Sequence, residues 1–169
     1  MIDYKNADNE LRDTYSNLAP VVKDIVAKHT KNIDEAMKKI KKDSAETMSN
    51  KELRNLILEL QVEEFYFAPS KDLAVLRQEC AVALERTAQA EIYNGTEGTQ
   101  NYRTNKATAH TVDKEVVRIL YNAVANTMKT KLEETHRMIG VLNSILISRS
   151  AEAKLKGANG DDDTRNNID

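Results

Sequence analysis

The amino-acid sequence predicts an all-α protein, built as an elongated helical bundle or a coiled-coil hairpin with a long C-terminal helix and a disordered acidic tail. Apolar residues recur every three or four positions over most of the 169 residues, which is the period of a helix that buries one face. The chain contains only 5 Gly and 2 Pro, so few sharp turns are expected. Trp is absent and Phe occurs twice, which disfavours a sandwich or barrel of many short strands.

The clearest helical pattern lies between residues 18 and 43, after a shorter acidic helix expected at residues 6–16. Pro20 suits the first turn of the longer helix, because its missing N–H would have no partner there. His29 falls on the apolar stripe and is expected to be a core or interface histidine. The residues expected to face inward are Leu18, Val22, Val26, His29, Ile33, Ala36 and Ile40.

The middle of the chain is expected to form two helices. Ser49 followed by Glu52 is a capping-box pattern, which predicts a helix from Asn50 to about Tyr66. We expect Pro69 to end that helix and the next one to run over residues 71–93. The turn residues at 94–98 predict a loop. The expected inward residues are Leu53, Leu56, Ile57 and Leu60 in the first helix, and Leu73, Leu76, Cys80, Ala83, Leu84, Thr87 and Ala90 in the second.

The C-terminal third predicts one long helix, or two stacked helices with a weak point at Gly140, ending near Leu155. The sequence thus divides into N-terminal helices at 1–70, a hairpin with the long basic helix at 71–156, and a disordered tail at 157–169. Such a helix is longer than a compact monomer can cover, so a homodimer or larger assembly is expected. The alternative is a monomer that folds back near Gly140 or before Val112. The stripe contains Val117, Leu120, Val124, Met128, Leu132, Thr135, Ile139, Leu142 and Leu146.

Patterns typical of catalysis or metal binding are weak. Glu133 and His136 form one Glu-x-x-His, but di-iron bundles need a second copy. Cys80 follows Glu79, whose negative charge does not favour a thiolate, so it is expected to be a packing residue. The Gly-x-x-Gly at Gly95–Gly98 holds an acidic insert and is expected to be a simple turn. We expect no enzymatic activity, no catalytic or metal residues and no cofactor.

The first residues carry no apolar segment after a basic start, and no apolar run is long enough to cross a bilayer. The expected location is therefore the cytoplasm. Charge is segregated: residues 99–156 hold ten Lys or Arg against five Asp or Glu, and residues 45–98 hold five against ten. This indicates either pairing between helices or a basic surface for phosphates. The candidate phosphate contacts are Lys38, Lys39, Lys41, Lys42, Arg103, Lys106, Lys129 and Lys131.

The run Phe65-Tyr66-Phe67 holds three of the eight aromatic residues. Three successive side chains cannot all face one side of a helix, so at least one is exposed or packed by a partner. Aromatic anchors dominate protein interfaces, which makes this run the best candidate for a partner interface. The other interpretation is a plug at the helix end. If the chain self-associates, Leu132 and Ile139 are expected to lie in the seam.

A resemblance extends from Leu76 to Glu152. Leu76-Arg77-Gln78, Ala88 to Tyr93, then Gly98, Arg103, Lys106, Ala107 and Ala109, and a long basic helix ending Ile147 to Glu152 resemble the small all-helical accessory proteins encoded in early regions of tailed bacteriophages. The resemblance implies a non-catalytic role beside replication or recombination, or as an inhibitor of host defence, in the host cytoplasm. Our first hypothesis is an interaction module that binds a protein or nucleoprotein complex; the alternative is a nucleic-acid-binding accessory protein.

Overall fold

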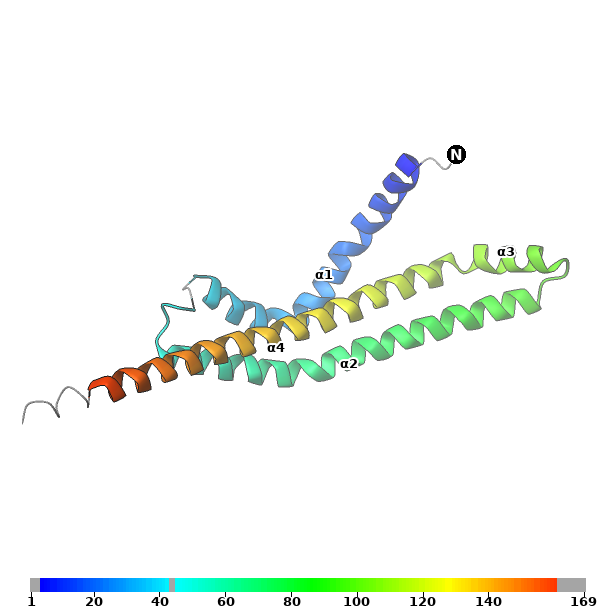
Figure 1. The fold of residues 1–169 in the computed structure, drawn as a ribbon. Coiled ribbons are helices and arrows are strands. Elements are labelled where there is room, and N and C mark those ends of the chain that lie inside the picture. The colour runs from blue at the N-terminus through cyan, green and yellow to red at the C-terminus, as the bar shows by residue number, and fades with distance from the viewer. Residues whose placement is uncertain (1–3, 43–44, 161–169) are drawn as a thin grey trace, which may run out of the picture. The chain divides into compact units, whose positions relative to one another are not determined.

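The computed structural model describes the backbone of residues 4–42 and 45–160 and the side chains of residues 17–40 and 45–155. The described residues form four helices and no strand: α1 Tyr4–Lys42, α2 Asn50–Asn94, α3 Gln100–His110 and α4 Val112–Gly160 (Figure 1). The prediction of an all-α fold is confirmed. Within the described residues, no helix is both long and apolar enough to span a membrane.

The chain divides into two compact units. Unit 1 consists of residues 1–31 and 66–132, and unit 2 consists of residues 32–65 and 133–169. The helices α1, α2 and α4 are each divided between the two units, with one segment in unit 1 and another in unit 2. Helix α3 belongs to unit 1 alone. The two units are described separately below.

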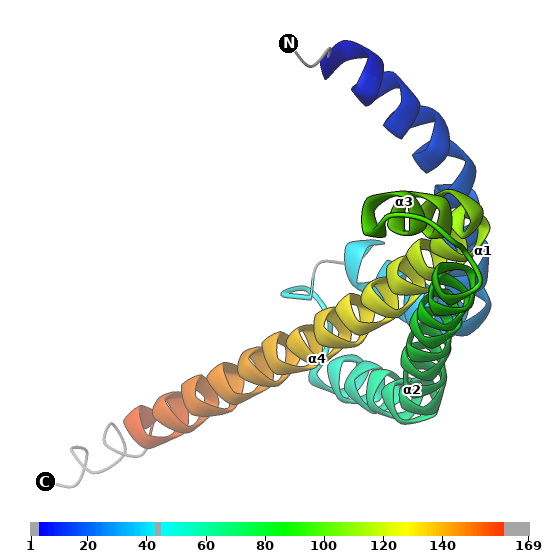
Figure 2. The same cartoon turned by 90° about the vertical axis from the view of Figure 1, so that its right-hand side faces the viewer.

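In unit 1, α2 and α4 run antiparallel and α3 lies beside the end of α2, across the loop at 95–99 (Figures 1 and 2). The loop predicted at 94–98 is confirmed. Gly98 has a φ of 123°, a conformation that glycine adopts without strain. Thr99 caps α3, because its hydroxyl accepts a hydrogen bond from the Tyr102 amide. The buried apolar residues of this unit are Val26, Phe67, Ala74, Ala81, Ala107, Val124, Ala125 and Met128.

Thr111 separates α3 from α4, at the break that the sequence placed before Val112. Its side chain is buried, and its hydroxyl donates to the Ala107 carbonyl at 3.0 Å. Of the two alternatives predicted around Gly140, the structure has the one long helix: Gly140 lies inside α4, with open space where a Cβ would be. Glycine alone does not break a helix when the residues on both sides are packed, as Ile139 and Leu142 are here.

Unit 2 has a continuous apolar core formed by α1, α2 and α4. The four inward residues predicted for the start of α2 are all buried, which confirms that prediction. They pack with Ala36 of α1 and with Ile139 and Leu142 of α4. Partly buried side chains, among them Met48 and Leu146, pack around this cluster. The core residues of α2 are Leu53, Leu56, Ile57 and Leu60.

The capping box at the start of α2 is formed as the sequence predicts. The Ser49 amide donates to Glu52 Oε2 at 2.7 Å, and the Glu52 amide donates to Ser49 Oγ at 3.3 Å. The side-chain hydrogen bond with Ser49, and then its backbone hydrogen bond, lower the pKa of Glu52 below the ordinary value of a glutamate. The charged form of Glu52 is therefore preferred in the folded chain.

We expect Glu52→Gln to unfold at a lower temperature than the wild type at pH about 7, and we expect this difference to shrink as the pH falls below about 4.3. The stabilisation from a lowered pKa is present above the unfolded pKa of about 4.3 and is lost as pH falls through the folded pKa. Thermal unfolding followed by circular dichroism measures both temperatures. Glu46→Gln, at an exposed site of the preceding loop, is the control. A gap between Glu52→Gln and wild type that does not change with pH would contradict this explanation.

Several predicted boundaries are wrong. Pro20 and Pro69 both lie inside continuous helices, so residues 6–16 do not form a separate helix and α2 does not end at Pro69. A proline removes one backbone hydrogen bond, but packing on either side can hold the helix together. Phe67 and Ala74, which flank Pro69, are both buried. The helix α4 continues past Leu155 to Gly160, and residues 161–169 of the expected tail lie outside the described residues.

Three predictions about which side chains face inward need correction. His29 is exposed, and the neighbouring Thr30 is buried in its place. The other members of the α1 stripe are buried or half-buried. Val117 of α4 is 40% exposed, whereas the stripe from Leu120 onward is buried or half-buried as expected. The third correction, on α2 beyond Pro69, bears on function and is described next.

Candidate functional site

The α2 segment of unit 1 presents to solvent the apolar side that the sequence analysis placed inward. Leu73, Leu76 and Leu84 are 45%, 54% and 62% exposed. Cys80 is exposed as well, so its prediction as a packing residue is wrong. We call this side the α2 outer face; its members are Leu73, Leu76, Cys80, Ala83, Leu84, Thr87 and Ala90, all of them exposed.

The inward side of the same segment carries small and polar residues. Ala74 and Ala81 are buried, and between and beyond them lie Gln78, Glu85 and Gln89. Small side chains allow the helices to approach closely, and the polar side chains have partners on α4 or at Thr111, between α3 and α4. This explains why the alanine side, and not the leucine side, faces inward.

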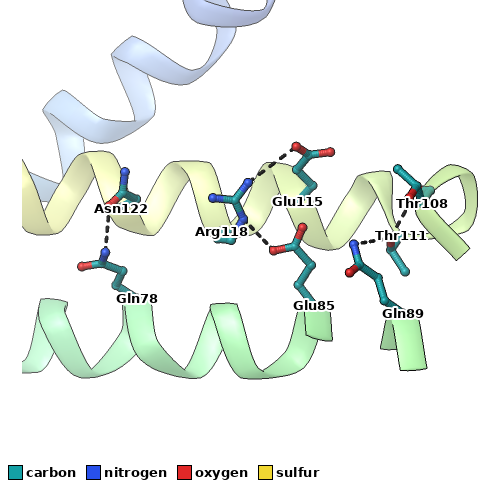
Figure 3. Close-up of polar contacts among 8 residues, drawn as sticks. All are labelled: Gln78, Glu85, Gln89, Thr108, Thr111, Glu115, Arg118 and Asn122. Carbon is teal, nitrogen blue, oxygen red and sulfur yellow. Dashed lines mark hydrogen bonds and ion pairs between the residues drawn. The ribbon is translucent and has the colours of Figure 1, made fainter. Parts of the chain in front are cut away.

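Contacts between polar side chains join α2 to the α3–α4 region in unit 1 (Figure 3). Gln78 Nε2 donates to Asn122 Oδ1 at 2.7 Å, and Gln89 Nε2 donates to Thr111 Oγ1 at 3.4 Å. Between them, Arg118 Nε lies 2.6 Å from Glu85 Oε2.

The Glu85 side chain is 12% exposed and that of Arg118 is 34% exposed, so this ion pair is shielded from water. Arg118 also lies 3.5 Å from Glu115 on its own helix. Thr111 Oγ1 is within 3.3 Å of the Thr108 carbonyl. No buried side-chain N or O atom among the described residues lacks a hydrogen-bond partner, and these contacts hold α2 against the α3–α4 region in unit 1.

The aromatic run is divided between solvent and core. Phe65, in unit 2, is 75% exposed, and Tyr66, in unit 1, is 69% exposed. Phe67 is 2% exposed and Ile139 is 6% exposed, while Leu132 is half-buried. Phe67 and Ile139 therefore pack inside their own chain, and Leu132 does so in part, while the assignment of these three side chains to a partner interface stays a prediction.

Sequence reasoning missed two exposed residues near Phe65. Leu58 is 60% exposed and Val62 is 43% exposed, and both lie on the same side of α2 as Phe65 in unit 2. The sequence did contain a signal for this side of the helix: Leu58, Val62 and Phe65 follow one another at spacings of four and three positions. We call Leu58, Val62 and Phe65 the anchor face.

The candidate phosphate contacts are divided between the two units. Lys39, in unit 2, lies 2.6 Å from Glu59 Oε1. Arg103, in unit 1, lies 3.9 Å from the centre of the Tyr93 ring and donates to the Tyr93 carbonyl at 2.9 Å. Lys131 also takes part in an interaction within the chain.

The remaining candidate lysines lie in different parts of the chain. The side chains of Lys41 and Lys42 lie outside the described residues. Lys38, in unit 2, and Lys106 and Lys129, in unit 1, are exposed and form no ion pair with another described residue. Pairing between acidic and basic segments, as in Lys39–Glu59 and Arg118–Glu85, accounts for part of the charge segregation.

No constellation for metal binding is present among the described side chains, where no group of three His, Cys, Asp or Glu side chains could hold an ion. His136 Nδ1 lies 3.3 Å from Glu64 Oε1 in unit 2, and its side chain is 78% exposed. A surface cavity of about 440 Å³ in the same unit is lined by residues that include Lys39, Glu52 and Glu59. These charged groups already bind one another or Ser49, so the cavity offers no unsatisfied reactive group.

Comparison with known proteins gives no relative: no protein-family model, no curated protein and no solved structure matches the chain. Function is therefore argued from exposed surfaces. The two surfaces that stand out are the anchor face in unit 2 and the α2 outer face in unit 1.

Proposed function

We propose that this chain is a non-enzymatic helical interaction module that binds another protein through the anchor face of α2. The observation that carries the proposal is the 75% exposure of Phe65 together with Leu58 and Val62 on one helix side. Aromatic side chains are enriched among residues that dominate binding energy, and an apolar helix side is a common binding element. The resemblance of residues 76–152 to phage accessory proteins supports a role in modulating a protein or nucleoprotein complex of a host cell.

The anchor face lies on the side of α2 that faces away from the apolar core of unit 2. The core residues Leu53, Leu56 and Leu60 of α2 lie on the opposite side and are at most 4% exposed. Contiguous exposed apolar side chains are uncommon on monomers and often mark interaction sites. Because Leu58, Val62 and Phe65 expose most or much of their apolar surface on one side of α2, we assign that side to contact with a partner.

Phe65→Asp is expected to reduce capture of the partner at least about tenfold, since a charge enters an apolar contact. The matched control is Ile147→Asp, at a side chain of α4 in unit 2 that is 69% exposed. The experiment compares proteins captured from the native host by wild type and by both variants, quantified by mass spectrometry. Circular dichroism checks that both variants keep wild-type helicity. A captured set that Phe65→Asp and Ile147→Asp retain equally would contradict the proposal.

Direct binding of nucleic acid is the second candidate, favoured by the exposed Lys106 and Lys129 of unit 1, neither of which forms an ion pair with another described residue. Phosphate contacts release counterions, so binding would weaken steeply with salt. A Lys106→Ala, Lys129→Ala double variant would then lower both the affinity and its salt dependence. Capture that survives high salt and still depends on Phe65 would reject this alternative.

A further inference from the structure

We infer that the α2 outer face of unit 1 binds the same face of a second copy of this chain, with the two α2 helices antiparallel. The inference involves a different unit and different residues from the anchor face, so it stands whether or not the proposed function holds. It rests on three observations: the position of the face, the order of side-chain sizes along it, and the charges beside it.

The α2 outer face points away from the chain's own core. At about 100° per residue, Leu73, Leu76 and Leu84 are centred roughly 100° around the helix axis from Ala74 and Ala81. The alanines are 4% exposed and the leucines at least 45% exposed. The intramolecular packing of unit 1 therefore leaves a complete apolar stripe of α2 uncovered.

The order of side-chain sizes along the stripe fits an antiparallel pair. Leu73 and Leu76 lie at one end, Thr87 and Ala90 lie at the other, and Cys80 and Ala83 lie between them. These positions alternate by three and four residues, as in a helix-pairing seam. A parallel pair would stack leucine on leucine at one end and small residues on small residues at the other.

An antiparallel pair instead matches each large side chain with a small one. Leu73 meets Ala90 of the partner subunit, Leu76 meets Thr87 of the partner subunit, and Cys80 meets Ala83 of the partner subunit. All three layers share one midpoint, between Ala81 and Val82, so a single twofold axis generates them. Even packing along the seam favours this orientation.

The charges on one flank of the stripe are complementary in the same register. Glu79 and Arg86 are both exposed, and neither forms an ion pair with another described residue. In an antiparallel pair the same flank of each helix meets, so Glu79 faces Arg86 of the partner subunit and Arg86 faces Glu79 of the partner subunit. Their midpoint lies between Val82 and Ala83, one residue from the midpoint of the apolar layers. Apolar packing and charge therefore select the same register.

The test is the mass of the full chain by sedimentation equilibrium over a wide concentration range. Wild type is expected to reach twice the monomer mass of 19.1 kDa. Glu79→Arg and Arg86→Glu each place like charges together twice per dimer, so each is expected to raise the dissociation constant at least about tenfold. The double variant Glu79→Arg, Arg86→Glu reverses both partners and is expected to restore the dimer. Arg137→Glu, at an exposed site of α4, is the control.

Orientation is tested by disulfide formation in a Cys80→Ala background. Mixed Leu73→Cys and Ala90→Cys chains are expected to give mainly the mixed disulfide, whereas a parallel pair would give Leu73→Cys homodimers. A wild-type mass that stays at 19.1 kDa, or a dimer that both single charge reversals leave intact, would overturn the inference. A dimer that Phe65→Asp dissociates while Glu79→Arg does not would also overturn it, because the second copy would then occupy the anchor face.

Discussion

The Leu60→Ala variant is expected to lose about 2–5 kcal/mol of unfolding free energy, the largest effect of any substitution considered. Leu60 is fully buried in the core of unit 2, where α1, α2 and α4 contribute side chains to one cluster. Truncation removes three carbon atoms and leaves a cavity. The surrounding helices can fill this cavity only in part. Urea denaturation followed by circular dichroism gives the free energy and its midpoint.

Leu58→Ala is the matched control, because it makes the same chemical change two positions earlier on the same helix. Leu58 is 60% exposed, so its truncation is expected to change the unfolding free energy by less than about 0.5 kcal/mol. Equal losses in the two variants would mean that the buried side of α2 in unit 2 is wrongly assigned.

Arg149→Ala is expected to destabilise the chain by about 1–3 kcal/mol. The Arg149 guanidinium donates to the carbonyls of Met48 and Glu46, both at 2.6 Å. It also donates to the Ala45 carbonyl at 3.3 Å and to Asn50 Oδ1 at 3.1 Å. One side chain of α4 thus holds the segment that leads into α2, and its loss leaves several carbonyls without a partner.

The readouts for Arg149→Ala are urea denaturation and the rate of proteolysis within residues 45–49, which is expected to rise. Arg149→Lys should recover only part of the loss, because an ammonium lacks the planar fork of donors. Arg137→Ala is the control, since Arg137 is exposed on the same helix and has no ion pair with a described residue. Unchanged proteolysis in Arg149→Ala would show that the segment is held by other contacts.

Much of the fold could be predicted from local signals. The scarcity of glycine and proline predicted long helices, and the capping box at Ser49 and Glu52 marked the start of α2. The loop near Gly98 was visible because a glycine with positive φ is needed there. Each of these features depends on a few neighbouring residues, which is why sequence alone was sufficient.

The side of α2 that faces inward in unit 1 could not be predicted, because two stripes compete. Leu76 and Leu84 form the more apolar stripe, yet Ala81 and Glu85 face inward. Which side of α2 faces inward depends on Arg118 of α4, because its guanidinium forms an ion pair with Glu85 of α2. Periodicity detects a helix, but it does not tell which of two sides meets a distant polar partner.

The helix interruption expected at Pro69 was mispredicted for a related reason. Proline and glycine weaken an isolated helix, yet α2 is continuous through Pro69 and α4 is continuous through Gly140, because neighbouring side chains are packed. The interruption between α3 and α4, at Thr111, lies where the sequence analysis allowed the chain to fold back before Val112. The anchor face was found only in part: Phe65 was expected from its aromatic neighbours, whereas Leu58 and Val62 became visible once the buried side of α2 was known.

The antiparallel contacts of unit 1 have a consequence for the order in which the chain folds. Gln89 and Thr111 are 22 residues apart and Gln78 and Asn122 are 44 apart, whereas Asn50 and Arg149 in unit 2 are 99 apart. The entropy lost in closing a loop grows with its length, so contacts next to the loop at 95–99 form at the lowest cost. Each contact that forms shortens the loop that the next contact has to close. We therefore expect the α2–α4 pairing to start in unit 1, with the core of unit 2 completed last.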